Sequence, residues 1–331
     1  MILTVTPNPS LDRTYEIPAL ERGAVLRAGA DRVDPGGKGV NVSRAVAAAG
    51  HRTTAVLPLG GPEGALLSRL LTGQGIEVAA VPVAGRTRVN ISAVEPDGTL
   101  TKLNAAGPEL TAAESEALLT AAGRHAAAGA AWTVCCGSLP RGLGDDWYAE
   151  LVARTHRAGA RIALDTSGPA LIRALAERPD VIKPNADELA DAVGRALVTV
   201  RDAAEAAEEL RAAGAQAVLA SLGPAGQLLV DRTGMYFGSA PVAAVRSDVG
   251  AGDASLAGFV TAGGTGPGAL AAALAHGAAA VQLPGSAMPT PADLRPEAVT
   301  VTPDVPLDQP LHLPPSPRSR PHPRTADGAV R

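Results

Sequence analysis

The feature that most constrains the fold is an alternation of short apolar runs with amphipathic stretches, which begins after Pro108. Each apolar run is short enough to be a buried strand, and each amphipathic stretch has helical spacing. We expect strands at residues 133–136, 161–164, 181–182, 217–220 and 227–230. Helices are expected at residues 111–128, 146–158, 170–176, 187–193, 202–213, 252–262 and 268–281. This pattern predicts a three-layer α/β/α core with a mostly parallel central sheet covered on both faces.

The first hundred residues interrupt this alternation. Residues 11–34 and 85–104 look like hairpins, the second with a Pro96-Asp97-Gly98 turn signal. We expect these two stretches to form a small β-sheet that stands off the main domain as a lid. The whole folded domain is expected to span residues 1–302, and the Pro- and Arg-rich residues 303–331 to form a disordered tail.

Composition and charge exclude several functional classes. The chain has 331 residues and a formal net charge of −4, with no long basic run in the expected domain, which argues against a nucleic-acid partner. It has no apolar run of membrane-spanning length and no basic segment of a signal peptide at its N-terminus, so we expect a cytoplasmic protein without a membrane segment. Cys135 and Cys136 are neighbours on an apolar strand and should point to opposite faces, so both are expected to be buried, reduced thiols.

The strongest chemical motif is the glycine turn from Gly250 through Ala251 and Gly252 to Asp253, directly before an apolar helix. Glycines let the backbone turn tightly, and a helix start adds unpaired N–H groups and the positive end of the helix dipole. Together these groups predict an anion hole for a transferring phosphoryl group, with the Asp253 carboxylate placed to take the proton of an attacking hydroxyl. The alternative is that Asp253 only caps the helix.

A second glycine-rich turn, Gly36-Gly37-Lys38-Gly39, also opens a helix, and Asn41 follows it closely. Lys38 supplies a positive charge and Asn41 an amide, which suits a phosphorylated or hydroxyl-rich ligand. The spacing fits neither a Walker A loop nor the glycine fingerprint of a dinucleotide-binding fold, which weakens an interpretation as an NAD-dependent oxidoreductase. A purely structural turn is the alternative.

Two further turns are candidate ligand contacts. Lys183 and Asn185 follow a short strand, and Glu188 shares a face with Asn185 at a helix start. This amide and carboxylate predict Mg²⁺ binding through water, with a helix cap as the alternative. The glycine-rich segment from Ser221 to Gly226 is either a contact for nucleotide phosphates or ribose, or a plain hairpin turn.

Polar residues on the first half of the chain are candidates for the sugar side. Asp12 follows the first strand and either accepts hydrogen bonds from sugar hydroxyls or closes an Asx-turn. Arg88 and Asn90 alternate with Val89 on a strand, so their side chains share a face, which is either a phosphate-binding or a solvated one. The six histidines show no metal-binding spacing.

Taken together, these motifs resemble the phosphofructokinase B family of the ribokinase-like superfamily. The similarity runs in order through TPNPSLD, PGGKGVNVSRA, TRVN, NAAGP, GSLPRG, KPNADEL, SLGPAG and VGAGDASLAGF, over about residues 1–295. The resemblance implies a ribokinase-like fold and a kinase that uses ATP and Mg²⁺ to phosphorylate a sugar phosphate.

The resemblance also implies a role for each matching position. Asp253 is expected to be the catalytic base, with Gly250, Ala251 and Gly252 as its anion hole. Residues of the nucleotide side are expected to be Lys183, Asn185, Glu188, Ser221, Gly223 and Gly226, with Asn185 and Glu188 organising Mg²⁺. Residues of the sugar-phosphate pocket are expected to be Asp12, Arg27, Gly37, Lys38, Asn41, Arg88, Asn90 and Ser138.

The Gly-Gly-Lys-Gly form of the second motif is similar to that of 1-phosphofructokinases and tagatose-6-phosphate kinases. Lys38, Arg88 and Arg27 supply several cations for a substrate that is already phosphorylated. The expected reaction is therefore phosphorylation of D-fructose 1-phosphate at its 6-hydroxyl. Alternatives are a kinase for tagatose 6-phosphate or fructose 6-phosphate, and a regulator that binds a sugar phosphate without turning it over.

A lid sheet exposes an edge and an apolar face, so we also expect a homodimer through the lid.

Overall fold

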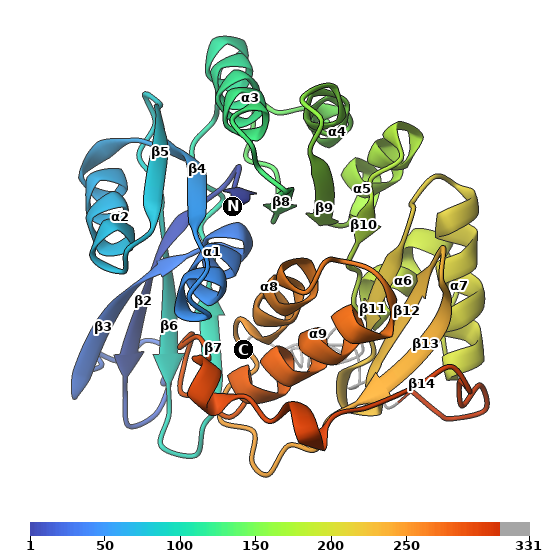
Figure 1. Cartoon of the computed structure of the whole chain (residues 1–331). Helices are drawn as coiled ribbons and strands as arrows, with labels where there is room; N and C mark the ends of the chain where they lie inside the picture. The colour runs from blue at the N-terminus through green and yellow to red at the C-terminus, as the bar shows by residue number, and fades with distance from the viewer. Residues whose placement is uncertain (312–331) are drawn as a thin grey trace, which may run out of the picture.

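The computed structural model describes residues 1–311, and its largest element is a ten-stranded sheet in the order β14-β13-β12-β11-β10-β9-β8-β1-β4-β5 (Figure 1). All strands from β11 to β5 run parallel, while β12, β13 and β14 continue the sheet in antiparallel pairs. The mostly parallel sheet is thereby confirmed. The strands are β1 (Ile2–Val5), β4 (Thr53–Leu59), β5 (Glu77–Pro82), β8 (Trp132–Cys136), β9 (Arg161–Asp165), β10 (Val181–Ile182), β11 (Val218–Ser221), β12 (Gln227–Asp231), β13 (Gly234–Ser239) and β14 (Thr300–Thr302).

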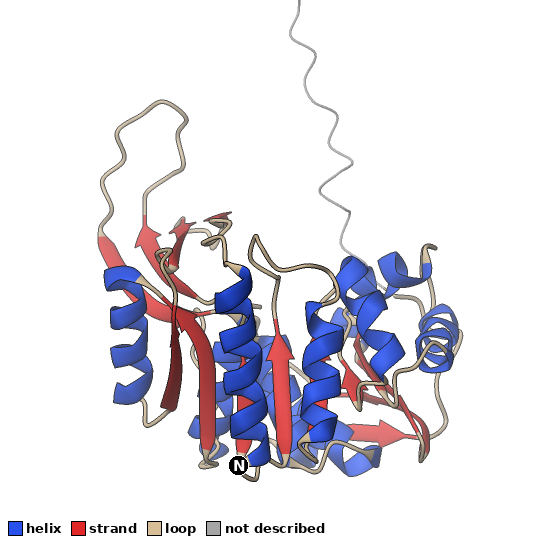
Figure 2. Cartoon of the chain, turned by 90° about the horizontal axis from the view of Figure 1, so that it is seen from above, coloured by secondary structure: helices blue, strands red, loops and turns tan. Residues whose placement is uncertain are grey.

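Helices cover both faces of this sheet, as Figure 2 shows in contrasting colours. One layer contains α1 (Lys38–Ala48), α2 (Gly61–Gly73), α8 (Ala251–Thr261) and α9 (Gly266–Ala280). The opposite layer contains α3 (Ala112–Ala127), α4 (Trp147–Arg157), α5 (Gly168–Ala174), α6 (Ala186–Val193) and α7 (Val200–Ala212). This is the predicted three-layer α/β/α core. No helix within residues 1–311 is long and apolar enough to cross a membrane.

Neighbouring residues of a strand pack into different hydrophobic cores, one on each face of the sheet. On β8, Cys135 packs with the α3–α7 layer, whereas Cys136 packs with the layer of α1, α8 and α9. Both thiols are free and buried, as predicted, and burial raises the pKa of each. Buried thiols of this kind are poor nucleophiles, so they serve the core rather than the chemistry.

Small residues let α8 and α9 approach closely, which fixes the helix that carries Asp253. A side chain at Gly258 on α8 would come within 2.6 Å of both the Ala272 carbonyl and the His276 ring on α9. Helix α8 packs against α1 on its other side (Figure 1). The low aromatic content of 2% therefore does not prevent a dense core, because alanine and glycine bring the backbones together.

A second sheet of four strands, in the order β3-β2-β6-β7, lies beside the main one and forms the predicted small β-sheet (Figure 1). Its strands are β2 (Ser10–Glu16), β3 (Ala30–Gly36), β6 (Arg88–Val94) and β7 (Leu100–Leu103). Strands β2 and β6 pair in parallel, and each has an antiparallel neighbour. The two stretches expected to build the lid thus come together although about 50 residues separate them, which only tertiary contacts could arrange.

The C-terminal boundary differs from the expectation. Residues 303–311, which we expected to belong to a disordered tail, run along α7 and add to the fold. The Leu311 N–H donates to the Val198 carbonyl at 2.7 Å, and the Val200 N–H donates to the Gln309 carbonyl at 2.9 Å. Leu311 is buried in the core beneath α7. Val305 and Leu307 also pack against this core. The proline content concealed these apolar contacts, and the rest of the expected tail, residues 312–331, lies outside the described residues.

Candidate active site

The candidate site lies at the carboxyl edge of the parallel strands, where β1, β8, β9 and β10 end. In parallel α/β sheets ligands bind at this edge, because loops and helix N-termini converge there. A cavity of about 560 Å³ opens at this place. Its walls include four predicted sugar-side residues and one predicted nucleotide-side residue, namely Gly37, Lys38, Arg88, Ser138 and Glu188.

The glycine turn before α8 has the conformation that the motif predicted. Gly250 adopts a left-handed backbone, with φ of 82°, and a side chain there would also meet the end of Met288 at 2.8 Å. Helix α8 starts at Ala251, and the Gly252 N–H has no acceptor among residues 1–311. A free N–H at the positive end of a helix is the kind of donor that stabilises phosphoryl charge.

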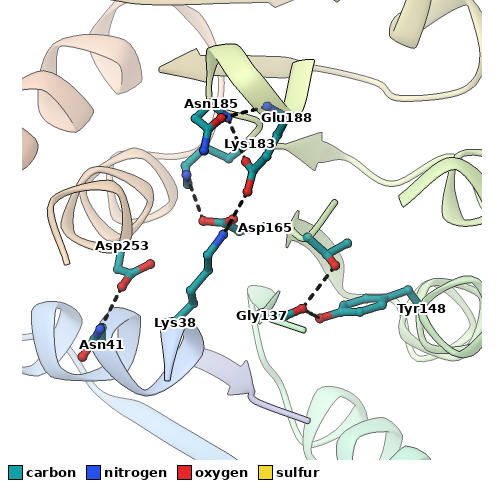
Figure 3. A network of polar contacts seen from close by, with 10 residues as sticks. Lys38, Asn41, Gly137, Tyr148, Asp165, Lys183, Asn185, Glu188 and Asp253 are labelled. Atoms are coloured by element: carbon teal, nitrogen blue, oxygen red, sulfur yellow. Dashed lines mark hydrogen bonds and ion pairs between the residues drawn. The ribbon is translucent and has the colours of Figure 1, made fainter. Parts of the chain in front are cut away.

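Asp253 follows in the first turn of α8 and is only 6% exposed. The Asn41 amide donates a hydrogen bond of 2.9 Å to its carboxylate (Figure 3). The Arg44 guanidinium donates to the Asn41 oxygen, which orients that amide. Burial and then the charge of Asp165 raise the pKa of Asp253 to about 7. A carboxyl with such a pKa exchanges its proton near neutral pH, as a general base must.

A second carboxylate, Asp165 at the end of β9, holds two lysines together in the middle of the site (Figure 3). Lys38 Nζ lies 2.7 Å from one carboxylate oxygen and Lys183 Nζ lies 2.8 Å from the other. Burial alone would raise the pKa of Asp165, but the charges of Lys183 and Lys38 outweigh it and lower the pKa. Asp165 therefore stays ionised, and its charge is one reason why the pKa of Asp253 is raised.

Lys183 connects this cluster to the start of α8. Its Nζ is close enough to Gly252 that an added methyl group would lie 3.3 Å away. Its side chain is almost fully buried, and its ammonium group points at Asp165 (Figure 3). The positive charge of Lys183 thus lies beside the free N–H of the glycine turn. Together these two groups form an anion-attracting region at the start of α8, and neither of them is among the residues that line the cavity.

Asn185 and Glu188 form a capping box at the start of α6, which was the alternative interpretation of their spacing. The Glu188 N–H donates to the Asn185 side chain at 2.8 Å, and the Asn185 N–H donates to Glu188 Oε2 at 2.9 Å. The other oxygen of Glu188 contacts Lys38 at 3.3 Å and faces the cavity (Figure 3). Among residues 1–311, no group of three or more His, Cys, Asp or Glu side chains could hold a metal ion.

Asp12 and Asn90 meet across the parallel pair of β2 and β6. The two residues are register partners, and the Asn90 amide donates to Asp12 at 2.9 Å, while the Ser10 hydroxyl donates to the same oxygen at 2.8 Å. A side chain at Gly36 would overlap the Asp12 carboxylate, so the glycine at this position leaves room for it. Asp12, Asn90 and Ser10 therefore form a small polar cluster on β2 and β6, and β6 also carries Arg88, which lines the cavity.

Arg88 lines the cavity, but most of its hydrogen bonding is directed at the backbone. One terminal nitrogen donates to the Ala105 carbonyl and the other to the Asn8 carbonyl, each at 2.9 Å. Burial lowers the pKa of Arg88, with a smaller opposing effect from Asp12. The guanidinium is still charged at neutral pH, and no ion pair with a carboxylate is formed within residues 1–311, so its charge is available to an anion.

Ser138 is held at the cavity by the backbone of its neighbour Gly137. The Gly137 carbonyl accepts hydrogen bonds from the Tyr148 hydroxyl at 2.7 Å and the Thr166 hydroxyl at 3.2 Å (Figure 3). The Gly137 N–H donates to the Asp165 carbonyl at 2.9 Å. The turn that presents Ser138 is thus attached to the same strand end that carries Asp165.

Several predicted residues lie away from the cavity. Arg27 is exposed in the loop between β2 and β3 and does not line the cavity. Ser221, Gly223 and Gly226 lie in the turn between β11 and β12, which is the antiparallel hairpin that was one of the two interpretations. This turn is adjacent to α6, because the Ser221 N–H donates to the Pro184 carbonyl at 3.0 Å.

The sequence interpretation missed two residues of this region. Asp165 was not singled out, although a carboxylate directly after an apolar strand of a parallel sheet is a signal for the ligand-binding edge. Asn8 was treated only as part of a strand ending, yet its buried side chain contacts the loop 104–107. Both residues act through contacts with residues about 100 or more positions away.

A second cavity, of about 450 Å³, lies at the opposite edge of the parallel strands, beside Trp132 and Arg161. Two of its lining carboxylates have partners: Asp180 accepts from His156 and from the Ile162 N–H, and Asp231 accepts from the Gly266 N–H. The Arg161 guanidinium stacks over Trp132 at 4.1 Å. These polar groups satisfy one another, so the chemistry is concentrated at the carboxyl edge.

The fold and the site define a class: a ribokinase-like α/β enzyme with a small second sheet and a helix start for phosphoryl charge. The model of the pfkB family of carbohydrate kinases matches residues 6–293. The chain belongs to this family, which confirms the resemblance of its motifs. The predicted class, an ATP-dependent sugar-phosphate kinase, is confirmed at this level.

Relatives within the family carry two different names. The chain is 40% identical over 260 residues to a 1-phosphofructokinase of Rhodobacter capsulatus, covering 78% of this chain and 82% of the relative. It is 39% identical over 259 residues to an ATP-dependent 6-phosphofructokinase isozyme 2 of Mycobacterium tuberculosis, covering 77% and 76%. The solved structure of phosphofructokinase-2 from Escherichia coli in complex with potassium superimposes with a TM-score of 0.82 at 32% identity, covering 88% and 96%.

Proposed function

We propose that this kinase phosphorylates D-fructose 1-phosphate at its 6-hydroxyl, giving D-fructose 1,6-bisphosphate, with ATP as phosphoryl donor. The observation that carries the proposal is the buried Asp253 carboxyl, whose pKa is raised to about 7, beside two lysines and a free helix N–H group. The name of the Rhodobacter capsulatus relative supports the choice of sugar. The name of the Mycobacterium tuberculosis relative favours fructose 6-phosphate as the second candidate.

In the proposed mechanism the sugar hydroxyl attacks the γ-phosphorus of ATP in line with the leaving oxygen, and Asp253 accepts the hydroxyl proton. The free N–H of Gly252 and the ammonium groups of Lys183 and Lys38 stabilise the charge of the transferring group. When ATP arrives, its phosphates compete with Asp165 for the two lysines. The turn of Ser221, Gly223 and Gly226 is proposed to contact the nucleotide.

The sugar phosphate is proposed to occupy the cavity of about 560 Å³. Arg88 offers its positive charge to the phosphate that the sugar already carries. Hydrogen-bonding groups for the sugar hydroxyls are offered by Ser138 and by the cluster of Asp12 and Asn90. Arg27 is exposed at present, so its proposed contact with the sugar phosphate requires the loop between β2 and β3 to fold over the cavity.

Mg²⁺ fits this site as a companion of ATP rather than as a resident ion. Glu188 and Asp145 are the carboxylates among the described residues that line the cavity, while Asp165 is occupied by lysines and the Asn185 side chain caps α6. One carboxylate plus phosphates and water is a usual Mg²⁺ environment. Glu188 would hold the ion through water, and the ion would neutralise phosphate charge.

The experiment that tests the function is a coupled assay of ADP formation with fructose 1-phosphate, fructose 6-phosphate and tagatose 6-phosphate. We expect kcat/KM to be at least tenfold higher for fructose 1-phosphate than for the other two. A higher value for fructose 6-phosphate would reject the choice of sugar. Calorimetric binding of a sugar phosphate without any turnover would favour the regulator instead.

We also propose a homodimer through the lid sheet. Leu103 on β7 is 64% exposed and Ile91 on β6 is 37% exposed, so the sheet of β3, β2, β6 and β7 presents apolar side chains to solvent. Burying such residues between two copies is favourable. Sedimentation of the wild type is expected to give twice the chain mass of 33.1 kDa, and Leu103→Asp is expected to shift it to the monomer.

A further inference from the structure

Four residues without regular secondary structure, 104–107, pass beside the opening of the sugar cavity, and we call this segment the strap. Its first residue, Asn104, lines the cavity. Within residues 1–311, the hydrogen bonds to the strap come from three side chains. Arg88 donates to the Ala105 carbonyl at 2.9 Å, Asn90 accepts from the Ala105 N–H at 3.2 Å, and Asn8 donates to the Ala106 carbonyl at 3.0 Å.

Asn8 is the residue that connects the strap to the rest of the pocket. Its backbone carbonyl accepts from Arg88 at 2.9 Å, and its amide nitrogen lies 3.5 Å from the Ser138 hydroxyl. The residue is only 4% exposed, and its side-chain oxygen has no hydrogen-bond partner within the described chain. A buried polar atom without a partner is expensive and calls for an explanation.

Gly107 shows how tightly the strap fits over Asn8. A side chain at residue 107 would overlap the oxygen of the Asn8 amide, and φ of 90° at this glycine is unfavourable for other residues. Asn8 therefore lies in direct contact with the strap. Two neighbouring polar atoms, Thr6 Oγ1 and Arg88 Nε, are also buried without partners beside the same cavity.

We propose that Asn8 is a positioning residue that sets the affinity and selectivity for the sugar phosphate. By holding the strap at Ala106, its side chain fixes the outer wall of the cavity and directs Asn104 toward a sugar hydroxyl, while its backbone carbonyl holds Arg88. This inference rests on the proposed function, because it assumes that the cavity binds a ketose phosphate. It assigns no contact with ATP to Asn8.

The test compares two substitutions at one position. Asn8→Ala removes the side chain, whereas Asn8→Asp keeps its shape, removes the amide hydrogen bonds to Ala106 and Ser138 and adds a negative charge. For both we expect the KM for fructose 1-phosphate to rise at least tenfold, with kcat within threefold and the KM for ATP within twofold of wild type. The matched control is Thr155→Val, which also removes a buried polar group but lies on α4, away from the cavity. Its KM values are expected to stay unchanged.

A second measurement uses the free protein and does not depend on turnover. The Ala105 N–H is bonded to Asn90, so its hydrogen exchange reports how firmly the strap is held. We expect exchange at Ala105 to be at least tenfold faster in Asn8→Ala than in wild type. Unchanged exchange, or an equal rise of the KM values for sugar phosphate and ATP, would overturn the role of Asn8. If the wild-type protein turned over none of the ketose phosphates, the proposed function would be overturned instead. The hydrogen-exchange measurement would still test whether Asn8 holds the strap.

Discussion

Replacing Asp253 with asparagine is the most informative perturbation of this protein, because the structure predicts opposite effects on activity and stability. The substitution keeps the shape of the side chain, and the new amide oxygen can still accept the hydrogen bond that Asn41 donates at 2.9 Å. It removes the only group of the first turn of α8 that can take a proton. The change therefore separates proton transfer from packing.

The effect on stability follows from the raised pKa. Asp253 has a pKa of about 7 in the folded protein against an ordinary value of 3.8. Between these two values the unfolded chain ionises while the folded chain stays protonated, so stability falls as the pH rises from about 4 to about 7. The difference corresponds to about 4 kcal/mol at pH 8. Asparagine avoids this penalty but buries an extra N–H, which costs about 1–3 kcal/mol if unpaired. We expect a net gain of about 1–3 kcal/mol at pH 8 and a net loss of about 1–3 kcal/mol at pH 4, where only the cost of the extra N–H remains.

The assays are thermal unfolding at both pH values and ADP formation with the preferred sugar phosphate. Loss of a general base lowers kcat by about 10²–10⁴-fold. In the wild type, kcat/KM is expected to fall about tenfold for each pH unit below about 7, because the protonated carboxyl cannot accept a proton. Activity of Asp253→Asn within tenfold of wild type would refute the assignment of the base. A variant less stable than wild type at pH 8 would refute the electrostatic argument.

Three further predictions concern neighbouring residues. Lys183→Met leaves the buried Asp165 with one lysine and should lower the free energy of unfolding by about 3 kcal/mol, measured by denaturant unfolding. A loss below about 1 kcal/mol would contradict the ion-pair argument. Gly252→Ala places a methyl group 3.3 Å from Lys183 Nζ and should lower kcat at least tenfold with an unchanged melting temperature. A kcat equal to that of the wild type would show that phosphate does not approach the backbone N–H of residue 252. Tyr148→Phe removes the 2.7 Å hydrogen bond to the Gly137 carbonyl and should lower the free energy of unfolding by about 1 kcal/mol. It should also raise the KM for the sugar phosphate more than the KM for ATP. Equal increases in both KM values would show that the turn at Gly137 does not shape the sugar pocket.

Much of the architecture could be predicted because it depends on local patterns. The apolar runs at 133–136 and 161–164 became β8 and β9, since a strand buried on both faces needs only a short apolar run. The turn at Gly250 was recognisable because its left-handed conformation favours glycine. Residues 303–311 were misjudged for the same reason, because proline content is a local signal and the burial of Leu311 is not.

Residue types also indicated which side chains are near the reaction, but not how they are paired. Arg88 was expected to bind phosphate, yet its hydrogen bonds go to the backbone carbonyls of Ala105 and Asn8. Asn185 and Glu188 were expected to organise Mg²⁺, yet they cap α6 first. For Arg88 these partners lie 17 and 80 positions away, so spacing along the strand could not reveal them.

The sequence by itself determined the strands and helices of the parallel core and the glycine turn before α8, because strand length, helix periodicity and the φ preference of glycine act over a few residues. The kinase family followed from the resemblance of its ordered motifs. Only the tertiary structure decided the electrostatics of the site. Lys38 and Asp165 are 127 positions apart, and Asn41 and Asp253 are 212 positions apart, yet their side chains touch. The pKa of Asp253 depends on burial and on those neighbours, and both exist only when the chain has folded.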